Sequence, residues 1–393
     1  MTVASLGSLW GAIVAVVVGG LLGRLLTQTV LSWMAVYEHD ADEQKTLPSE
    51  ARLAGRVTPG QTASRWIECV AIVAAVALWW WELHQLGQMP TSVVGGPTEV
   101  VSAALVLRYA AHLAFGWLLA AATWIDIRHR IIPDCITVPG VLAGCVCVWL
   151  APDVLLPIAT EVPRSFASPQ VQSDVLGCVG GLRSASGWEW LGPSPQVVGL
   201  LVATGIFCVW WSICTSPAYG IEKRRWLEPR NIILGVGLVA ILVAWIFGTD
   251  HFRGLQSSLV GVAVSGGIVW ATRAGASRAM GREAMGLGDV TLMAMVGAWL
   301  GWQACVLAFF LAAFIGLAHG LVQLARHREH ELPYGPSLCL ATVCVVVFWR
   351  PLWTIAAISF EEPIQLAAIV GSVVLLTAVT LYFWRMIRDF SAP

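Results

Sequence analysis

The chain has 393 residues, of which 57% are hydrophobic and only 12% are charged, and its formal net charge is −1. Soluble proteins carry roughly 25% charged residues, so this composition excludes a soluble globular protein and predicts an integral membrane protein. The near-zero net charge gives no reason to expect a nucleic-acid partner, and we expect the lipid bilayer to surround the chain.

Ten cysteines are present, mostly inside apolar runs, and no Cys-x-x-Cys pair occurs. We interpret them as small packing residues. The sequence therefore predicts neither a metal site nor a disulfide framework.

A transmembrane helix needs about 20 mostly apolar residues, and the chain holds ten stretches of suitable length. They lie near 8–36, 66–88, 99–125, 135–152, 196–216, 230–248, 255–272, 303–325, 336–356 and 364–386. A shorter apolar stretch, 289–300, ends at Gly301. The sequence predicts an all-α, polytopic transmembrane helix bundle with about 10–11 crossings.

Lysine and arginine alternate between the predicted loops. Few occur in the loops 89–98, 153–195, 249–254 and 357–363, whereas the loops between these are rich in them. Because positively charged loops stay in the cytoplasm, this pattern predicts an outside N-terminus and a cytoplasmic C-terminus. That orientation needs an odd number of crossings, so the stretch 289–300 counts as a short eleventh crossing.

Two polar motifs, far apart in the sequence, each centre on one aspartate. Asp126 lies in the stretch Ile-Asp-Ile-Arg-His-Arg-Ile-Ile-Pro-Asp (125–134), at the end of the third apolar run. Asp289 closes Gly-Leu-Gly-Asp (286–289), before the short run. A carboxylate near hydrocarbon is costly and so indicates function. The predicted topology places both on the cytoplasmic side, on antiparallel helices that could bring the carboxylates together.

The residues around each aspartate fit this interpretation. Gly286 and Gly288 lack side chains, so the backbone can bend there and admit a substrate strand. Asp289 would stand at a helix N-terminus, where the helix dipole favours its anion, and Pro133 would end the helix that carries Asp126.

Two carboxylates that meet in a low-dielectric setting should share one proton. The ionised member could take a proton from water, and the protonated member could hydrogen-bond a scissile carbonyl. Peptide hydrolysis by this route needs no metal and no covalent intermediate.

Each polar motif also has a structural alternative. An aspartate at a helix N-terminus is often only a cap, and one beside Arg and His at a membrane boundary is often a solvated flank. Asp134 could replace Asp126 as catalyst, but its place after Pro133 in a predicted turn favours a structural or capping role. His327 and His330 have ligand-like spacing, but their charged linker favours a solvated segment over a metal site.

Arg108 and His112 lie four residues apart on one face of the predicted 99–125 helix. Such side chains either extend to the membrane interface or pair with a neighbouring helix, and both alternatives stay open. Arg24 would mark the cytoplasmic boundary or face the bundle, and Glu68 would face cytoplasmic water.

Three motifs, in this order, resemble those of the type IV prepilin peptidases. Asp126…Pro133-Asp134-x-Ile-Thr-x-Pro139 is similar to the first catalytic motif of that family, and Met285-Gly-Leu-Gly-Asp289 is similar to its Gly-x-Gly-Asp motif. The stretch Leu-Pro-Tyr-Gly-Pro (332–336) resembles its Pro-[Phe/Tyr]-Gly-Pro element, which opens a later helix. The resemblance covers residues 100–145 and 255–350, approximately.

The resemblance implies a membrane-embedded aspartyl endopeptidase that cleaves basic leader peptides from type IV prepilins or pseudopilins at the cytoplasmic face. It also implies a location in the bacterial inner membrane and no cofactor for cleavage. The implied catalytic residues are Asp126 and Asp289, and the implied supporting residues are Gly286, Gly288, Pro133 and Asp134.

Departures from the family shape the expected domains. Asp126 and Asp289 are 163 positions apart, about twice the separation in many members. We therefore predict N-terminal helices (1–98), a peptidase core (99–350) interrupted by an insertion at about 153–248, and a C-terminal helix and tail (351–393).

The N-terminal region lacks the cysteine-bearing cytoplasmic domain of many members. This departure argues against an N-methyltransferase activity, which alone would need S-adenosylmethionine. Thr291 also stands where a lysine is common in the family, a mild departure that could alter substrate preference.

Two other functions stay open at the level of sequence. A proton-coupled transporter could use Asp126 and Asp289 as proton relays, although relay carboxylates usually lie near the bilayer midplane rather than at one boundary. An inactive relative could serve as a scaffold in pilus or secretion assembly, although both aspartates and both motif glycines are retained. The sequence identifies neither a specific substrate nor an oligomeric state.

Overall fold

The computed structural model describes residues 9–43, 61–88, 102–159, 171–173, 197–215, 230–247, 250–325, 334–361 and 363–391. Within these ranges the protein is a helix bundle with one short antiparallel sheet, formed by β1 (Pro157–Ala159) and β2 (Val171–Ser173). Apart from this small sheet, the described chain is helical, and the predicted all-α class is confirmed.

Every apolar stretch predicted from the sequence falls on a helix or on two consecutive helices. In chain order these are α2 (Leu9–Glu43), α4 (Gln61–Trp79), the π-helical turn η1 (Trp80–His84), α6 (Ser102–His129), α7 (Asp134–Leu150), the short 3-10 turn η2 (Pro152–Val154), α9 (Val197–Thr215), α10 (Arg230–Phe247), α11 (Asp250–Met280), α12 (Leu287–Leu300), α13 (Trp302–Ala325), α14 (Gly335–Val347), α15 (Trp349–Glu361) and α16 (Pro363–Ser391).

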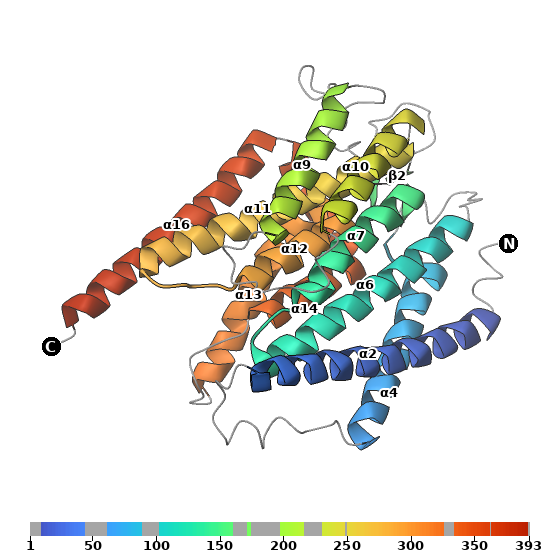
Figure 1. The fold of residues 1–393 in the computed structure, drawn as a ribbon, viewed down its shortest axis with the longest axis horizontal. Coiled ribbons are helices and arrows are strands. Elements are labelled where there is room, and N and C mark those ends of the chain that lie inside the picture. The colour runs from blue at the N-terminus through green and yellow to red at the C-terminus, as the bar shows by residue number, and fades with distance from the viewer. Residues whose placement is uncertain are drawn as a thin grey trace.

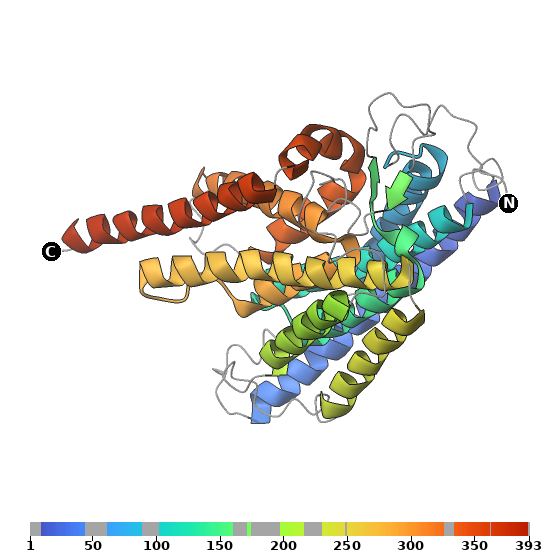
Figure 2. The same cartoon turned by 90° about the horizontal axis from the view of Figure 1, so that it is seen from above.

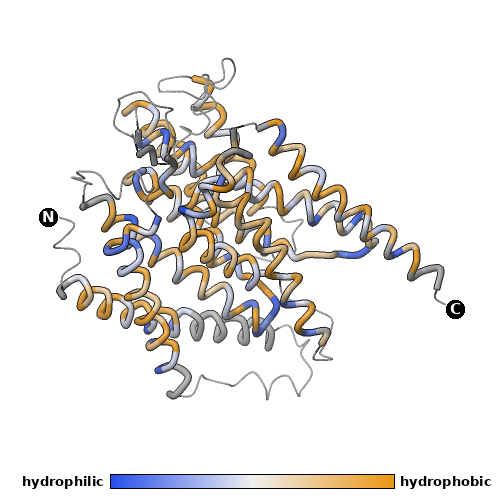
Figure 3. The backbone as a smooth tube through the Cα atoms, turned by 180° about the vertical axis from the view of Figure 1, so that it is seen from behind, coloured by the Kyte–Doolittle hydropathy of each residue, from blue (hydrophilic) through white to orange (hydrophobic). Residues whose placement is uncertain are grey.

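Seven of the described helices are long and apolar enough to cross a membrane, or up to eight if α14 and α15 together form one span. That pair is bent by 88°. Three shorter apolar helices, α7, α10 and α12, account for the remaining predicted stretches. Apolar residues dominate the helices throughout the bundle (Figure 3). The chain is therefore a multi-pass membrane protein, and the orientation of its termini stays a prediction.

Helix α12 lies at the centre of the bundle (Figure 1), in contact with α7, α11, α13 and α14. All of its residues from Asp289 to Leu300 are buried. Its 14 residues span about 21 Å, less than the roughly 30 Å of a bilayer core. A helix that is apolar on every side belongs in a protein interior. Asp289 is therefore surrounded by protein rather than by lipid.

The contact between α11 and α12 is made by small residues. A Cβ added at Gly261 would lie 2.1 Å from the Gly297 carbonyl oxygen, so the two backbones touch at this point. On either side of it, Ser258 donates a hydrogen bond to the Ala298 carbonyl (2.8 Å) and Ser265 donates to another α12 carbonyl (2.7 Å). Such close approach with hydroxyl bonds is typical of helices packed inside a membrane, and it fixes α12 along α11.

Two peripheral units flank this core. Helices α2 and α4 pack closely at Gly19, where an added Cβ would lie only 2.8 Å from the Ile72 Cα. Arg24 on α2 pairs with Glu68 on α4 at 3.6 Å, so both predicted boundary charges have a partner. Helix α16 lies along α11 (Figure 2) and exposes most of its remaining apolar surface, as expected of a helix that faces lipid.

Candidate active site

The helix that carries Asp126 ends one turn after it. Helix α6 stops at His129, and Arg130 adopts a left-handed conformation (φ 55°) while its amide donates to the Asp126 carbonyl (2.8 Å). Pro133 follows as the N-cap of α7. A proline disfavours helical backbone in the residue before it, so the predicted helix end before Pro133 is confirmed and has a local cause.

The Asp126 carboxylate meets the first turn of α14. It is only 5% exposed and accepts a hydrogen bond from the Gly335 amide. The first amides of a helix lack intrahelical partners, so the α14 N-terminus is a natural site for an anion. A Cβ added at Gly335 would lie 2.5 Å from Asp126 Oδ2. Position 335, in the third motif, must therefore be glycine, because a side chain there would collide with the Asp126 carboxylate of the first motif.

Asp289 stands in the first turn of α12, at the N-terminus of that helix. It is 8% exposed and accepts a hydrogen bond from the amide of Gly286, the N-cap residue. A carboxylate at the third helical position that reaches back to the N-cap amide is a known capping arrangement. The capping alternative considered for this motif is thus present, and the same hydrogen bond fixes the position of the carboxylate.

The structure brings the two aspartates together. The negative charge of Asp126 acts directly on Asp289. Their motifs touch at Gly288, where an added Cβ would lie 2.9 Å from Ile132 Cβ and 3.1 Å from the Ile132 carbonyl oxygen. Gly286 is exposed, and an added Cβ there would make only ordinary contact, 3.9 Å from Asp289 Oδ2. Ile132 therefore fills the space beside Gly288, where a substrate was expected to approach, whereas Gly286 is accessible at the surface.

Asp134 links two helices rather than facing the aspartate pair. Thr291 on α12 donates to Asp134 Oδ1 at 3.3 Å and to the Gly288 carbonyl at 3.0 Å. Asp134 is the first residue of α7, so this contact joins α7 to α12. The geometry favours the structural role for Asp134, and it gives Thr291 a role within the fold.

The loop that leads into α12 is held by α11. Arg273 donates to the Met285 carbonyl (2.9 Å) and forms an ion pair with Glu283. Gly281 ends α11 with a positive φ of 69°, a conformation that favours glycine. These contacts fix the segment just before Gly286, whose amide holds Asp289.

Sequence reasoning missed two residues, Thr123 and Cys339, that lie next to the aspartate pair. Thr123 on α6 donates to the Cys339 thiol on α14, and that thiol also experiences the charges of both aspartates. Thr123 precedes Asp126 by three positions and Cys339 follows Gly335 by four, which places each on the same helix face as its motif residue. That spacing was the available signal.

Tyr334 completes the surroundings of Asp289. Burial and the nearby charge of Asp289 raise the pKa of the Tyr334 phenol to about 12. The phenol is therefore protonated at neutral pH.

Other residues singled out from the sequence lie elsewhere. His327 and His330 fall outside the described residues, as do Leu332 and Pro333 of the third motif. Within the described part of the chain, no group of three or more His, Cys, Asp or Glu side chains is placed to hold a metal.

Arg108 and His112 bind neighbouring segments rather than extending to the membrane interface. His112 binds Glu82 at 2.6 Å, and Arg108 donates to the Asp153 carbonyl (2.6 and 3.0 Å). These residues lie on the half of α6 away from Asp126 and take no part in the candidate site.

Comparison with known proteins supports the resemblance drawn from the motifs. Residues 222–321 match the model of the type IV leader peptidase family. This range includes the Gly-x-Gly-Asp motif with Asp289 but not Asp126. It also includes α10, which we had placed in the insertion. No solved structure is similar to the chain.

Curated relatives named prepilin leader peptidase/N-methyltransferase are similar to parts of the chain. The protein of Aeromonas hydrophila is 33% identical over 124 residues, covering 31% of this chain and 42% of the relative. That of Stutzerimonas stutzeri is 32% identical over 155 residues (39% and 52%), and that of Pseudomonas aeruginosa is 36% identical over 125 residues (31% and 42%). The chain spans about half the length of these relatives, and its resemblance to the family is confirmed.

Proposed function

We propose that this chain is a membrane-embedded aspartyl endopeptidase that removes the leader from type IV prepilins or pseudopilins. One observation carries the proposal. Three motifs from distant parts of the sequence meet at a buried pair of aspartates, Asp126 and Asp289, and each carboxylate is held by a glycine amide at a helix N-terminus. The relatives named above carry the same activity in their names.

The chemistry follows from the pairing of two carboxylates that share one proton. The ionised carboxylate removes a proton from a water molecule, whose oxygen attacks the scissile carbonyl carbon. The protonated carboxylate hydrogen-bonds the carbonyl oxygen and stabilises the developing negative charge. When the tetrahedral intermediate breaks down, a proton passes to the leaving amine, and the pair returns to its starting state with one proton.

The glycine amides contribute by fixing the pair before the substrate arrives. Gly335 and Gly286 each donate to one carboxylate, so neither carboxylate needs to reorganise during the reaction. Preorganised groups of this kind provide much of the rate enhancement of enzymes. Gly286 is exposed and carries no side chain, so an extended peptide can approach the pair along this residue.

We place the reaction at the cytoplasmic face of the bacterial inner membrane. Asp126 and Asp289 lie near the arginine-rich ends of α6 and α11, where Arg128, Arg278 and Arg282 are found. Positive residues concentrate on the cytoplasmic side of membrane proteins. The proposed cleavage needs no cofactor, and methyl transfer from S-adenosylmethionine is not part of the proposal.

Co-expression with a prepilin-like protein tests this function. The substrate should have a basic leader, a glycine before the cut and an apolar helix after it, and its intact mass reports cleavage. We expect loss of the leader mass with the wild-type chain and no loss with the D126N/D289N double variant at equal membrane abundance. An extra methyl group in the same spectrum would reveal methylation. Uptake of a solute that depends on both aspartates, with no cleavage in any sample, would instead indicate a transporter.

A further inference from the structure

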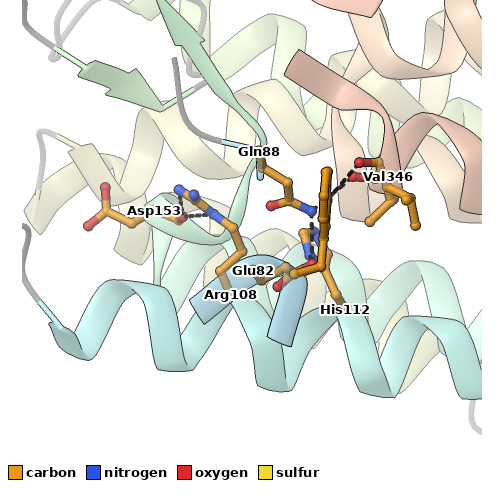
Figure 4. Close-up of polar contacts among 8 residues, drawn as sticks. Glu82, Gln88, Arg108, His112, Asp153 and Val346 are labelled. Atoms are coloured by element: carbon orange, nitrogen blue, oxygen red, sulfur yellow. Dashed lines mark hydrogen bonds and ion pairs between the residues drawn. The ribbon is translucent and has the colours of Figure 1, made fainter. Parts of the chain in front are cut away.

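A second group of buried polar side chains lies on the half of α6 away from Asp126. Glu82, Gln88, Arg108 and His112 are each at most 4% exposed, and they gather above α6 in Figure 4. His112 precedes Asp126 by 14 residues, or about 21 Å along the helix. Ionisable residues buried in a membrane protein are costly and usually serve a function, and the proposed mechanism uses none of these.

Glu82 connects the members of this group. His112 Nδ1 lies 2.6 Å from Glu82 Oε1, and Gln88 Nε2 donates to the same oxygen at 2.8 Å (Figure 4). Arg108 adds a positive charge that acts on Glu82. Charge and two hydrogen bonds thus compensate one oxygen of the buried carboxylate, whereas Glu82 Oε2 and His112 Nε2 are buried without a hydrogen-bond partner in the described part of the chain.

The same segment also reaches the far end of α14. Gln88 donates to the Val346 carbonyl (3.0 Å), and Trp81 Nε1 donates to the Val347 carbonyl (2.8 Å). Pro351, four positions after Val347, has no amide hydrogen, so it cannot supply the helical bond to that carbonyl. The chain bends by 88° here, and residues from the first quarter of the sequence donate hydrogen bonds to the carbonyls at the end of α14.

The backbone of residues 80–88 is irregular where it makes these contacts. Helix α4 widens into the π-helical turn η1, and Leu86 then adopts a positive φ of 49°, which is unfavourable for a side chain with a Cβ. Gly87 packs under the Trp81 ring, where an added Cβ would lie 2.2 Å from Trp81 Cε2. Strained backbone persists where the surrounding structure fixes it, often at functional positions.

We propose that Trp81, Glu82 and Gln88 form a clamp that positions the aspartate pair, an inference that rests on the proposed function. The chain of contacts His112–Glu82–Gln88–Val346 joins α6 to α14 at one end. The Asp126–Gly335 hydrogen bond joins the same two helices at the other end. By holding α14 in register with α6, the clamp keeps the Gly335 amide on the Asp126 carboxylate.

Thr123 and Cys339 provide a direct readout of this register. They are hydrogen-bonded to each other, one on α6 and one on α14, next to the aspartate pair. In the T123C variant, a disulfide between position 123 and Cys339 can form only while the two helices keep their relative position. Its yield after mild oxidation with iodine, identified by peptide mass spectrometry, requires no substrate and no proteolytic activity.

The clamp is weakened without removing a buried charge by combining W81F and Q88M in the T123C background. We expect the disulfide yield to fall at least about fivefold, because three hydrogen bonds from the two side chains are lost. The matched control is W80F/Q85M, which makes the same chemical changes at neighbouring positions with exposed side chains. A second control, Y109F, removes the buried Tyr109–Ala75 hydrogen bond between α6 and α4 without touching α14. Both controls should keep the yield of the T123C parent.

Cleavage of a co-expressed prepilin, measured without T123C, gives the second readout. The W81F/Q88M variant should lower kcat with KM unchanged, because the substrate path is intact and only the geometry of the pair is altered. The clamp is overturned if W81F/Q88M keeps both the disulfide yield of the T123C parent and the cleavage rate of the wild type. An equal loss of yield in Y109F would also overturn it, as would absence of the disulfide in the T123C parent. If no variant cleaves but the disulfide depends on Trp81 and Gln88, the clamp stands and the proposed function fails.

Discussion

At the scale of single residues, glycine amides organise the candidate site. Asp126 is held by Gly335 and Asp289 by Gly286, and Gly288 lets the two aspartate motifs touch. The aspartates could be predicted from the sequence because each lies in a short local motif. The close contacts of Gly288 and Gly335 could not, because they are made with residues more than 150 positions away.

The variant G335A tests the contact on which the geometry of Asp126 depends. The added methyl group would lie 2.5 Å from Asp126 Oδ2 and 2.8 Å from Ile132 Cδ1, so α14 or the carboxylate must move. A displacement of about 1 Å can cost roughly 100-fold in rate, and we expect a loss of that order in prepilin cleavage. The control is G316A on α13, whose added methyl group would make only ordinary contact with the Tyr334 ring at 3.5 Å. Equal activity in the two variants would refute the role of Gly335.

Tyr334 should be replaceable by phenylalanine. Its phenol is neutral at physiological pH because burial and the charge of Asp289 raise its pKa to about 12. Y334F should therefore change the cleavage rate less than about threefold.

The same pKa shift predicts how stability changes at high pH. A phenol whose pKa is raised from 10 to about 12 by folding stabilises the fold below pH 10 and loses this contribution as pH rises to 12. Wild-type protein should therefore lose more thermal stability than Y334F between pH 10 and pH 12. Parallel melting curves for the two proteins over that range would contradict the assigned environment of Tyr334.

At the scale of helices, α12 shows both the reach and the limit of sequence reasoning. Its short length and uniform apolar character could be predicted, and they explain why it lies inside the bundle. The break between α14 and α15 was missed because residues 336–356 look like one continuous apolar stretch. Pro351 was the signal, since a proline in a helix removes a backbone hydrogen bond.

The variant G261A tests the seating of α12 against α11. The added methyl group would lie 2.1 Å from the Gly297 carbonyl oxygen, backbone that cannot rotate away. We expect the free energy of unfolding in detergent to fall by about 1–3 kcal/mol or more, as for overpacked cores. The variant G267A on the same helix has nothing within 4 Å of the added methyl group and should unfold like the wild type. Indistinguishable melting of G261A and G267A would contradict the close contact.

At the scale of the whole molecule, the distribution of charge predicts an orientation that the helix arrangement leaves open. The positive-inside rule places the N-terminus outside and the C-terminus in the cytoplasm. A green fluorescent protein fused to the C-terminus should fluoresce, and alkaline phosphatase at the same place should be inactive. An epitope at the N-terminus should be cut by protease added outside the cytoplasmic membrane. The reverse pattern would move the aspartate pair to the other face and exclude cytoplasmic cleavage.

The most direct test of the account is the mass of a co-expressed prepilin-like substrate in the presence of three single variants. D126N and D289N should each lower cleavage at least about 100-fold, because each removes one member of a pair that must act together. D134N should cleave nearly as well as the wild type, because an asparagine oxygen can still accept the Thr291 hydrogen bond. Cleavage retained in D126N or D289N, at equal membrane abundance, would contradict the two-aspartate site.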